Sequence, residues 1–108
     1  MVRSKSEAFI ANQLEFYQIP YRYEEDLTFD WLTISPDFTI KRSSDGQIIL
    51  WEHFGAVHEP GYVEKMYKKF DFYEKHGYIP FETIIYTFEM DIQRIWRVRN
   101  YIEAILMI

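Results

Sequence analysis

Apolar and polar positions along the chain follow two different periods, and the changes between them predict the secondary structure. Residues 4–17, SKSEAFIANQLEFY, carry apolar side chains three or four positions apart, as one buried helix face requires. Residues 58–78 repeat this spacing, and Gly77 stands where a left-handed residue commonly follows a helix. Residues 92–108 predict a third amphipathic helix that closes the chain.

Strand patterns lie between these helices. Residues 19–29 alternate aromatic and polar side chains and predict a half-exposed strand. Residues 35–55 contain two apolar runs joined by a polar turn, and the β-branched and aromatic residues of 82–89 predict a buried strand. The expected order is α-β-β-β-α-β-α, which is an α/β (α+β) fold with a central mixed sheet flanked by helices. At 108 residues the chain has room for one domain, residues 1–108.

Two acids, Asp37 and Glu52, stand inside the apolar runs on either side of the polar turn. A four-residue loop at residues 43–46 would place them directly opposite each other on one face of the sheet. A two-residue loop would make them diagonal neighbours on that face, and a three-residue loop would put them on opposite faces. Like charges at directly opposed positions are destabilising unless something compensates them, and a divalent cation would do so.

The strand that contains Glu52 is apolar on both faces, which is typical of a central strand. A carboxylate buried there needs a partner, because an unpaired buried charge is costly. Two interpretations stay open at this point. Glu52 could share a cation with Asp37, or it could lie at the strand end, bonded to a backbone amide or paired with a lysine or arginine.

Composition narrows the functional classes. With 48% hydrophobic and 19% aromatic residues the chain can form a core, and the absence of cysteine excludes disulfides, thiolate metal sites and a cysteine nucleophile. No stretch has the length of a signal peptide's apolar region or of a membrane helix, so we expect a soluble, cytoplasmic protein without a membrane partner. The net charge of −5 argues against a large nucleic-acid surface, although a small phosphate-facing strip is compatible with it.

Three short words, "RSKSE", "PDFTI" and "WEHFG", together with the element order, resemble the PD-(D/E)XK or restriction-endonuclease-like nuclease superfamily, and in particular its small bacterial members. The resemblance covers nearly the whole chain and implies hydrolysis of DNA phosphodiester bonds with one or two Mg²⁺ or Mn²⁺ ions. On that pattern Asp37 would be the bridging ligand, Glu52 the second ligand, and the backbone carbonyl of His53 a third. Hard divalent cations prefer such oxygen ligands.

The chain departs from the superfamily pattern at Phe54, where a lysine is expected. Either the chain is an inactive member, or another cation replaces that lysine. Lys69 is our first candidate and Lys65 our second, because both lie on the predicted second helix, and Lys69-x-x-x-Tyr73 is similar to a Gln-x-x-x-Tyr element of some superfamily nucleases. The alternative is that both lysines belong to a solvated helix face.

Glu7 matches the place where the superfamily often adds a glutamate from the first helix, as a metal ligand that could act through water. Ser4 and Glu7 also have the S-x-x-E form of a capping box, so the same side chain has a structural explanation. The three histidines are too scattered for a zinc site. Trp31, Trp51 and Trp96 could stack on bases, but in a chain this aromatic most of them are expected in the core.

Three functions follow from these patterns. The first is a metal-dependent endonuclease or other DNA-processing enzyme, whose acidic charge suggests a narrow substrate contact, a homodimer, or a protein partner that supplies DNA affinity. The sequence does not separate DNA from RNA as substrate. The second is a catalytically inactive module that keeps the fold and binds DNA or a protein, and the third is a structural protein with an aromatic surface.

Overall fold

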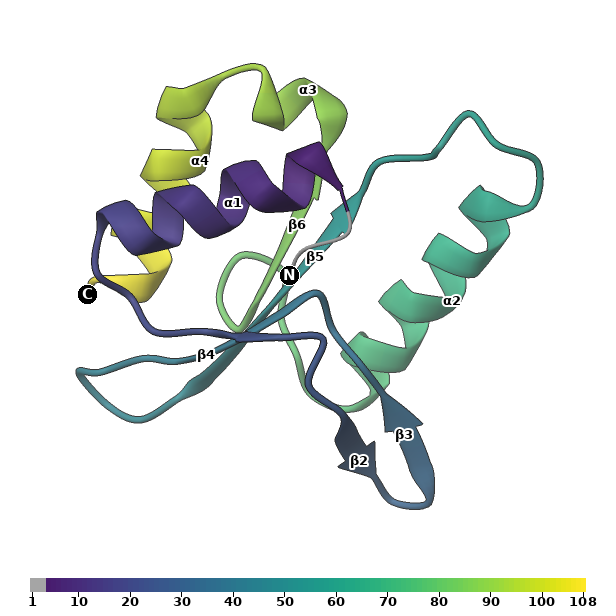
Figure 1. The fold of residues 1–108 in the computed structure, drawn as a ribbon. Helices are drawn as coiled ribbons and strands as arrows, with labels where there is room; N and C mark the ends of the chain where they lie inside the picture. Colours follow the sequence, from purple (N-terminus) through teal and green to yellow (C-terminus); the bar gives the residue numbers. More distant parts are fainter. Residues whose placement is uncertain (1–3) are drawn as a thin grey trace.

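The structure is a computed structural model and describes residues 4–108. The chain has a mixed α and β arrangement in which five strands follow the first helix and a helix precedes the last strand (Figure 1). The helices are α1 (Lys5–Phe16), α2 (Tyr62–Lys75), α3 (Glu89–Ile92), α4 (Ile95–Tyr101) and the π-helical turn η1 (Ile102–Leu106). The strands are β1 (Arg22–Tyr23), β2 (Leu27–Phe29), β3 (Leu32–Ile34), β4 (Phe38–Lys41), β5 (Ile48–Phe54) and β6 (Ile84–Phe88).

The main sheet has four strands in the order β1-β4-β5-β6. Strands β1 and β4, and β4 and β5, pair antiparallel, whereas β5 and β6 pair parallel. Helix α2 forms the crossover between the two parallel strands, as a parallel pair requires. The sheet is therefore mixed, with β5 in its interior, as the apolar pattern of that strand predicts.

Helices cover both faces of this sheet (Figure 1). On one face, α1, α4 and η1 bury a core that includes Leu14, Trp51 and Ile102. On the other face, α2 buries a second core that includes Leu50 and Tyr73. Alternate residues of β5 supply the two cores, because successive side chains of a strand point to opposite faces.

The turn between β4 and β5 has the four-residue form. Phe38 pairs with Trp51 and Lys41 with Ile48, and the Arg42 N–H donates to the Gln47 carbonyl at 2.8 Å. Continuing this register by one residue sets Asp37 opposite Glu52. The even-numbered loop and its consequence for the two acids are thus confirmed.

Two expected elements are wrong in detail. The single strand expected over residues 19–29 is broken into β1 and β2, because Glu24 takes a left-handed conformation with φ of 51°. After the break, β2 and β3 form a separate hairpin whose second strand the sequence pattern did not reveal. The closing helix is likewise broken, since Arg94 has the extended angles φ −124° and ψ 90° between α3 and α4.

The remaining elements agree with the expectations. Helices α1 and α2 lie within the predicted segments, and Gly77 follows α2 with φ of 88°. Among the described residues, no helix has both the length and the apolar character needed to cross a membrane.

Candidate functional site

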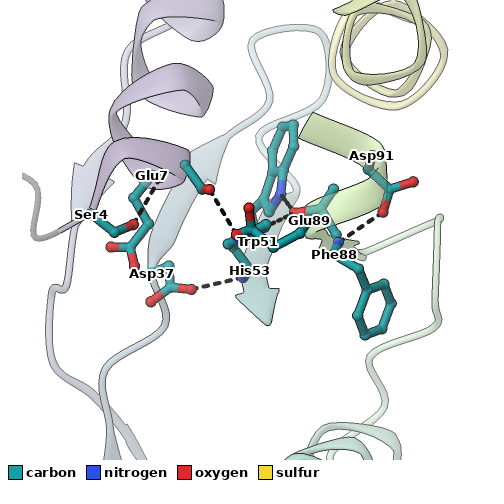
Figure 2. Close-up of polar contacts among 10 residues, drawn as sticks. Ser4, Glu7, Asp37, Trp51, His53, Phe88, Glu89 and Asp91 are labelled. Atoms are coloured by element: carbon teal, nitrogen blue, oxygen red, sulfur yellow. Dashed lines mark hydrogen bonds and ion pairs between the residues drawn. The ribbon is translucent and has the colours of Figure 1, made fainter. Parts of the chain in front are cut away.

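Asp37 lies immediately before β4, where it faces the end of β5. Its carboxylate accepts a hydrogen bond of 2.7 Å from the backbone N–H of His53 (Figure 2). Its own N–H donates to Glu52 Oε1 at 3.4 Å. Because the N–H and C=O of one strand residue face the same neighbouring strand, the His53 carbonyl faces the Asp37 side as well.

Glu52 is buried in the α2 face of the sheet, with only 1% of its surface exposed. Tyr73 donates its hydroxyl to Glu52 Oε2 at 2.6 Å, and Lys69 Nζ lies 3.3 Å from the same oxygen. Lys69 and Tyr73 are one helical turn apart on α2, so a single helix face supplies both groups. The partner that a buried carboxylate needs is therefore present in the protein itself.

The expected lysine position is occupied by Phe54, which is 3% exposed and packs against Phe70 and Tyr86. Lys69 approaches this place from the neighbouring helix, with Nζ 6.0 Å from the centre of the Phe54 ring. Lys65 lies one turn earlier on α2 with an exposed side chain. Of the two lysine candidates, Lys69 is the one that contacts a site acid.

A third and a fourth acid approach Asp37 from other elements. Ligand oxygens of Glu7, Glu24 and Asp37 all lie within 4.8 Å of one another. The Glu7 carboxylate accepts a hydrogen bond of 2.5 Å from Tyr23, while its N–H is capped by Ser4 Oγ at 3.1 Å. Only the Ser4 half of the expected capping box is therefore seen, and the Glu7 carboxylate points to Tyr23 and the acid cluster.

Glu24 is not among the site residues that the sequence pattern predicts. It follows β1 at the left-handed turn, and its N–H donates to the Asp37 carbonyl at 3.0 Å. The pairing of β1 with β4 thus brings Glu24 beside Asp37, across thirteen positions of the chain. A "YEED" run has no local feature that marks one of its acids for such a contact.

The electrostatics of Asp37 follow from this crowding. Burial, and then the nearby Glu52 carboxylate, raise the pKa of Asp37 to about 8. The His53 N–H and the Lys69 ammonium act in the opposite direction and stabilise the ionised form. Metal ligands must be deprotonated, and a cation beside Asp37 would favour its ionised form.

The donor set suits a hard divalent cation. Glu7, Glu24 and Asp37 offer carboxylate oxygens, which Mg²⁺ and Mn²⁺ prefer to nitrogen or sulfur. Glu52 is not a member of that close group, and its carboxylate contacts Tyr73 and Lys69. Two arrangements are therefore compatible with these residues: an ion held by Asp37 with Glu52, or an ion held by Asp37 with the acids of α1 and the β1 turn.

The His53 side chain lies on the opposite face of β5, as the strand alternation predicts. Nδ1 lies 2.9 Å from Thr87 Oγ1, and Nε2 lies 2.9 Å from Glu89 Oε1, which also accepts a bond from Ser6 (Figure 2). A Cβ atom added at Gly55 would lie 2.8 Å from the same Glu89 oxygen, so a side chain there would require the Glu89 carboxylate to shift. The network fixes the β5 end whose backbone binds Asp37.

The arginines of the closing helices have structural partners. Arg97 pairs with the buried Asp91 at 3.0 Å, and Arg99 donates to Gln13 at 2.8 Å. Two arginines of α4 therefore have partners within the protein, and a phosphate ligand is not needed to account for them.

No family model, curated protein or solved structure matches the chain. Its function is therefore inferred from the geometry of the site and from the motif words of the sequence.

Proposed function

We propose that the protein is a metal-dependent phosphodiesterase that hydrolyses DNA, with the acids around Asp37 as its metal site. The observation that carries this proposal is the convergence of Asp37, Glu7 and Glu24 beside the contact between the buried Glu52 and the partly exposed Lys69. Three segments far apart in the sequence supply acids to one point, in spite of their electrostatic repulsion. A restriction-endonuclease-like core, α-β-β-β-α-β, agrees with the observed sheet and with the resemblance of the motif words.

Each residue has a role in this proposal. Asp37 would be the central ligand, fixed by the His53 N–H, with the His53 carbonyl, Glu52 or Glu7 completing the protein's share. Lys69 would supply the positive charge that the missing strand lysine supplies elsewhere, and it would neutralise a phosphate oxygen. A bound Mg²⁺ or Mn²⁺ would withdraw charge from the phosphate and lower the pKa of a water molecule.

A second candidate function is a catalytically inactive binding module with the same fold. Its supporting observation is that Glu52 is already satisfied by Tyr73 and Lys69, while Phe54 is part of the core. A buried carboxylate with a hydroxyl and an ammonium partner is stable without a metal ion. On this view Lys69 maintains the fold.

Calorimetric titration of Mn²⁺ tests the metal site without knowledge of the substrate. We expect saturable binding by the wild-type protein, its loss in Asp37→Asn, and its weakening in Glu52→Gln. Glu82→Gln, which removes an exposed acid outside the cluster, is the matched control and should bind as the wild type. Binding that persists in Asp37→Asn would refute the site.

Nicking of supercoiled plasmid then separates the two functions. Under the first, plasmid is nicked in Mg²⁺ or Mn²⁺, nicking stops in EDTA, and it is abolished in Asp37→Asn. If the protein is an inactive binding module, the cation binds and the plasmid stays intact even at protein concentrations above the dissociation constant of the metal complex. An RNA strand tested beside the plasmid determines which nucleic acid is cut.

A further inference from the structure

One surface feature has no part in the site described above. Trp31 occupies the two-residue turn between β2 and β3 and is 92% exposed. The preceding Asp30 takes the left-handed conformation, with φ of 57°, that the tight turn needs. The hairpin extends away from the main sheet beside the end of α2 (Figure 1). A fully exposed tryptophan contributes nothing to the core, so folding does not explain its presence there.

The hairpin is anchored by a different residue. Phe29 packs against Phe72, His76 and Tyr78, with ring centres 5.2–6.0 Å apart. These contacts join β2 to the C-terminal end of α2 and hold the turn in place. Trp31 is therefore presented on a supported element, and its replacement should leave the hairpin intact.

The surface between Trp31 and the acid site is lined by lysines of α2. Lys65, Lys68 and Lys69 are three and four residues apart, and Lys68 and Lys75 are seven apart, so helical geometry places them on one flank. Lys69 reaches the site acid at one end of this flank, while Lys75 and Trp31 line one hollow of about 180 Å³ at the other end. Lys69 and Lys75 are about 9 Å apart along the helix axis and about 120° apart around it.

Acids lie beside these lysines. Glu64 and Asp71 each stand four residues before a lysine of α2, Lys68 and Lys75, and Asp30 lines the same hollow as Trp31. Within residues 4–108, none of these acids forms an ion pair with Lys65, Lys68 or Lys75, so these ammonium groups can contact a ligand. A ligand with closely spaced negative charges and a flat apolar part would satisfy both the lysines and the tryptophan.

We propose that this flank and Trp31 bind a single strand of DNA, with the lysines at its phosphates and the Trp31 indole stacked on an unpaired base. The proposal rests on the proposed action on nucleic acid and specifies its substrate as DNA with an unpaired segment. Stacking on an exposed aromatic needs an unpaired base, because the faces of paired bases are covered by their neighbours.

The test is fluorescence anisotropy with a labelled fifteen-nucleotide oligothymidine in EDTA at low salt. Trp31→Ala should weaken binding about five- to 150-fold, since base stacking contributes about 1–3 kcal/mol. Trp31→Phe, which keeps an aromatic ring, should recover most of the affinity. Trp96→Ala removes another exposed tryptophan, on the face of α4, and should bind as the wild type.

Salt dependence tests the lysines. The double variant Lys68→Gln, Lys75→Gln should reduce the slope of log K against log salt by about 0.7 for each phosphate that a lysine no longer neutralises. Arg94→Gln, an exposed cation outside the flank, should leave the slope unchanged. Urea midpoints equal to the wild-type value show that the variants are folded.

Three results would overturn the proposal: no binding by the wild-type protein, equal binding by Trp31→Ala, or an equal loss of affinity in the Trp96 control. A closed DNA dumbbell that binds as tightly as the oligothymidine would also overturn it, because it has no free unpaired strand of comparable length. If an RNA strand binds and the oligothymidine does not, the surface is an RNA-binding surface and the DNA proposal is refuted. EDTA removes any metal, so these outcomes are independent of Mn²⁺ binding and plasmid nicking, which test the proposed function.

Discussion

Replacement of Asp37 by asparagine should make the metal-free protein more stable at alkaline pH. Asparagine has nearly the same shape, and its side-chain oxygen can still accept the hydrogen bond from the His53 N–H. It lacks the negative charge that burial and Glu52 disfavour. The substitution therefore removes a repulsion and keeps the main polar contact.

The direction of the pH dependence follows from proton linkage. The pKa of Asp37 rises from 3.8 to about 8 on folding, so between these values the folded protein holds a proton that the unfolded chain has released. The resulting stability is fully present below pH 4 and is lost as the pH rises through 8. At about 1.4 kcal/mol per pKa unit, the upper bound on this loss is about 6 kcal/mol.

Solvent on the open side of the cluster reduces that bound. We expect Asp37→Asn to exceed the wild-type free energy of unfolding by about 2–3 kcal/mol at pH 9, and by less than about 0.5 kcal/mol at pH 4. Urea denaturation in EDTA at the two pH values measures both differences. Asp71→Asn, at an exposed position of α2, is the control and should show no such difference.

If the difference in stability between Asp37→Asn and the wild type is the same at pH 4 and pH 9, this reasoning is refuted, because ionisation of Asp37 then has no cost in the folded protein. Lower stability of the variant at pH 9 would show that the carboxylate itself holds the fold together. The expected result would mean that the protein carries an acid cluster that weakens its fold, which is common where a residue is kept for function.

Three further predictions concern the other groups. Tyr73→Phe should lower the free energy of unfolding by about 1.5–3 kcal/mol, because the buried Glu52 loses a hydroxyl donor. Tyr67→Phe, at an exposed position, is the control and should leave it unchanged. A Tyr73→Phe variant with the wild-type urea midpoint would contradict this prediction. Lys69→Ala should reduce plasmid nicking by about a hundredfold, and Lys65→Ala should not; similar rates in both would remove Lys69 from the site. The affinity for Mn²⁺, measured by calorimetry, should fall as the pH is lowered from 9 to 6, because protons compete with the metal ion for the acid cluster. An affinity that is constant over this range would exclude a metal site built on a carboxylate of raised pKa.

The local patterns of the sequence determined much of the structure. The period of apolar residues was sufficient for α1, α2 and β6, because each buries one face or one short run against a continuous core. Parity and the polar turn limited the register of β4 and β5 to a few alternatives, and the structure has the one with a four-residue turn. That register set Asp37 opposite Glu52 and turned the His53 side chain to the other face.

Tertiary structure alone decided the rest. Glu24 joins Asp37 because β1 pairs with β4 and then turns through a left-handed residue, and neither event has a sequence signal of its own. Trp31 is exposed because β2 and β3 leave the main sheet, although a tryptophan is by composition expected in the core. Local periodicity records which face of an element is buried, whereas the partner of a polar side chain depends on how distant elements pack.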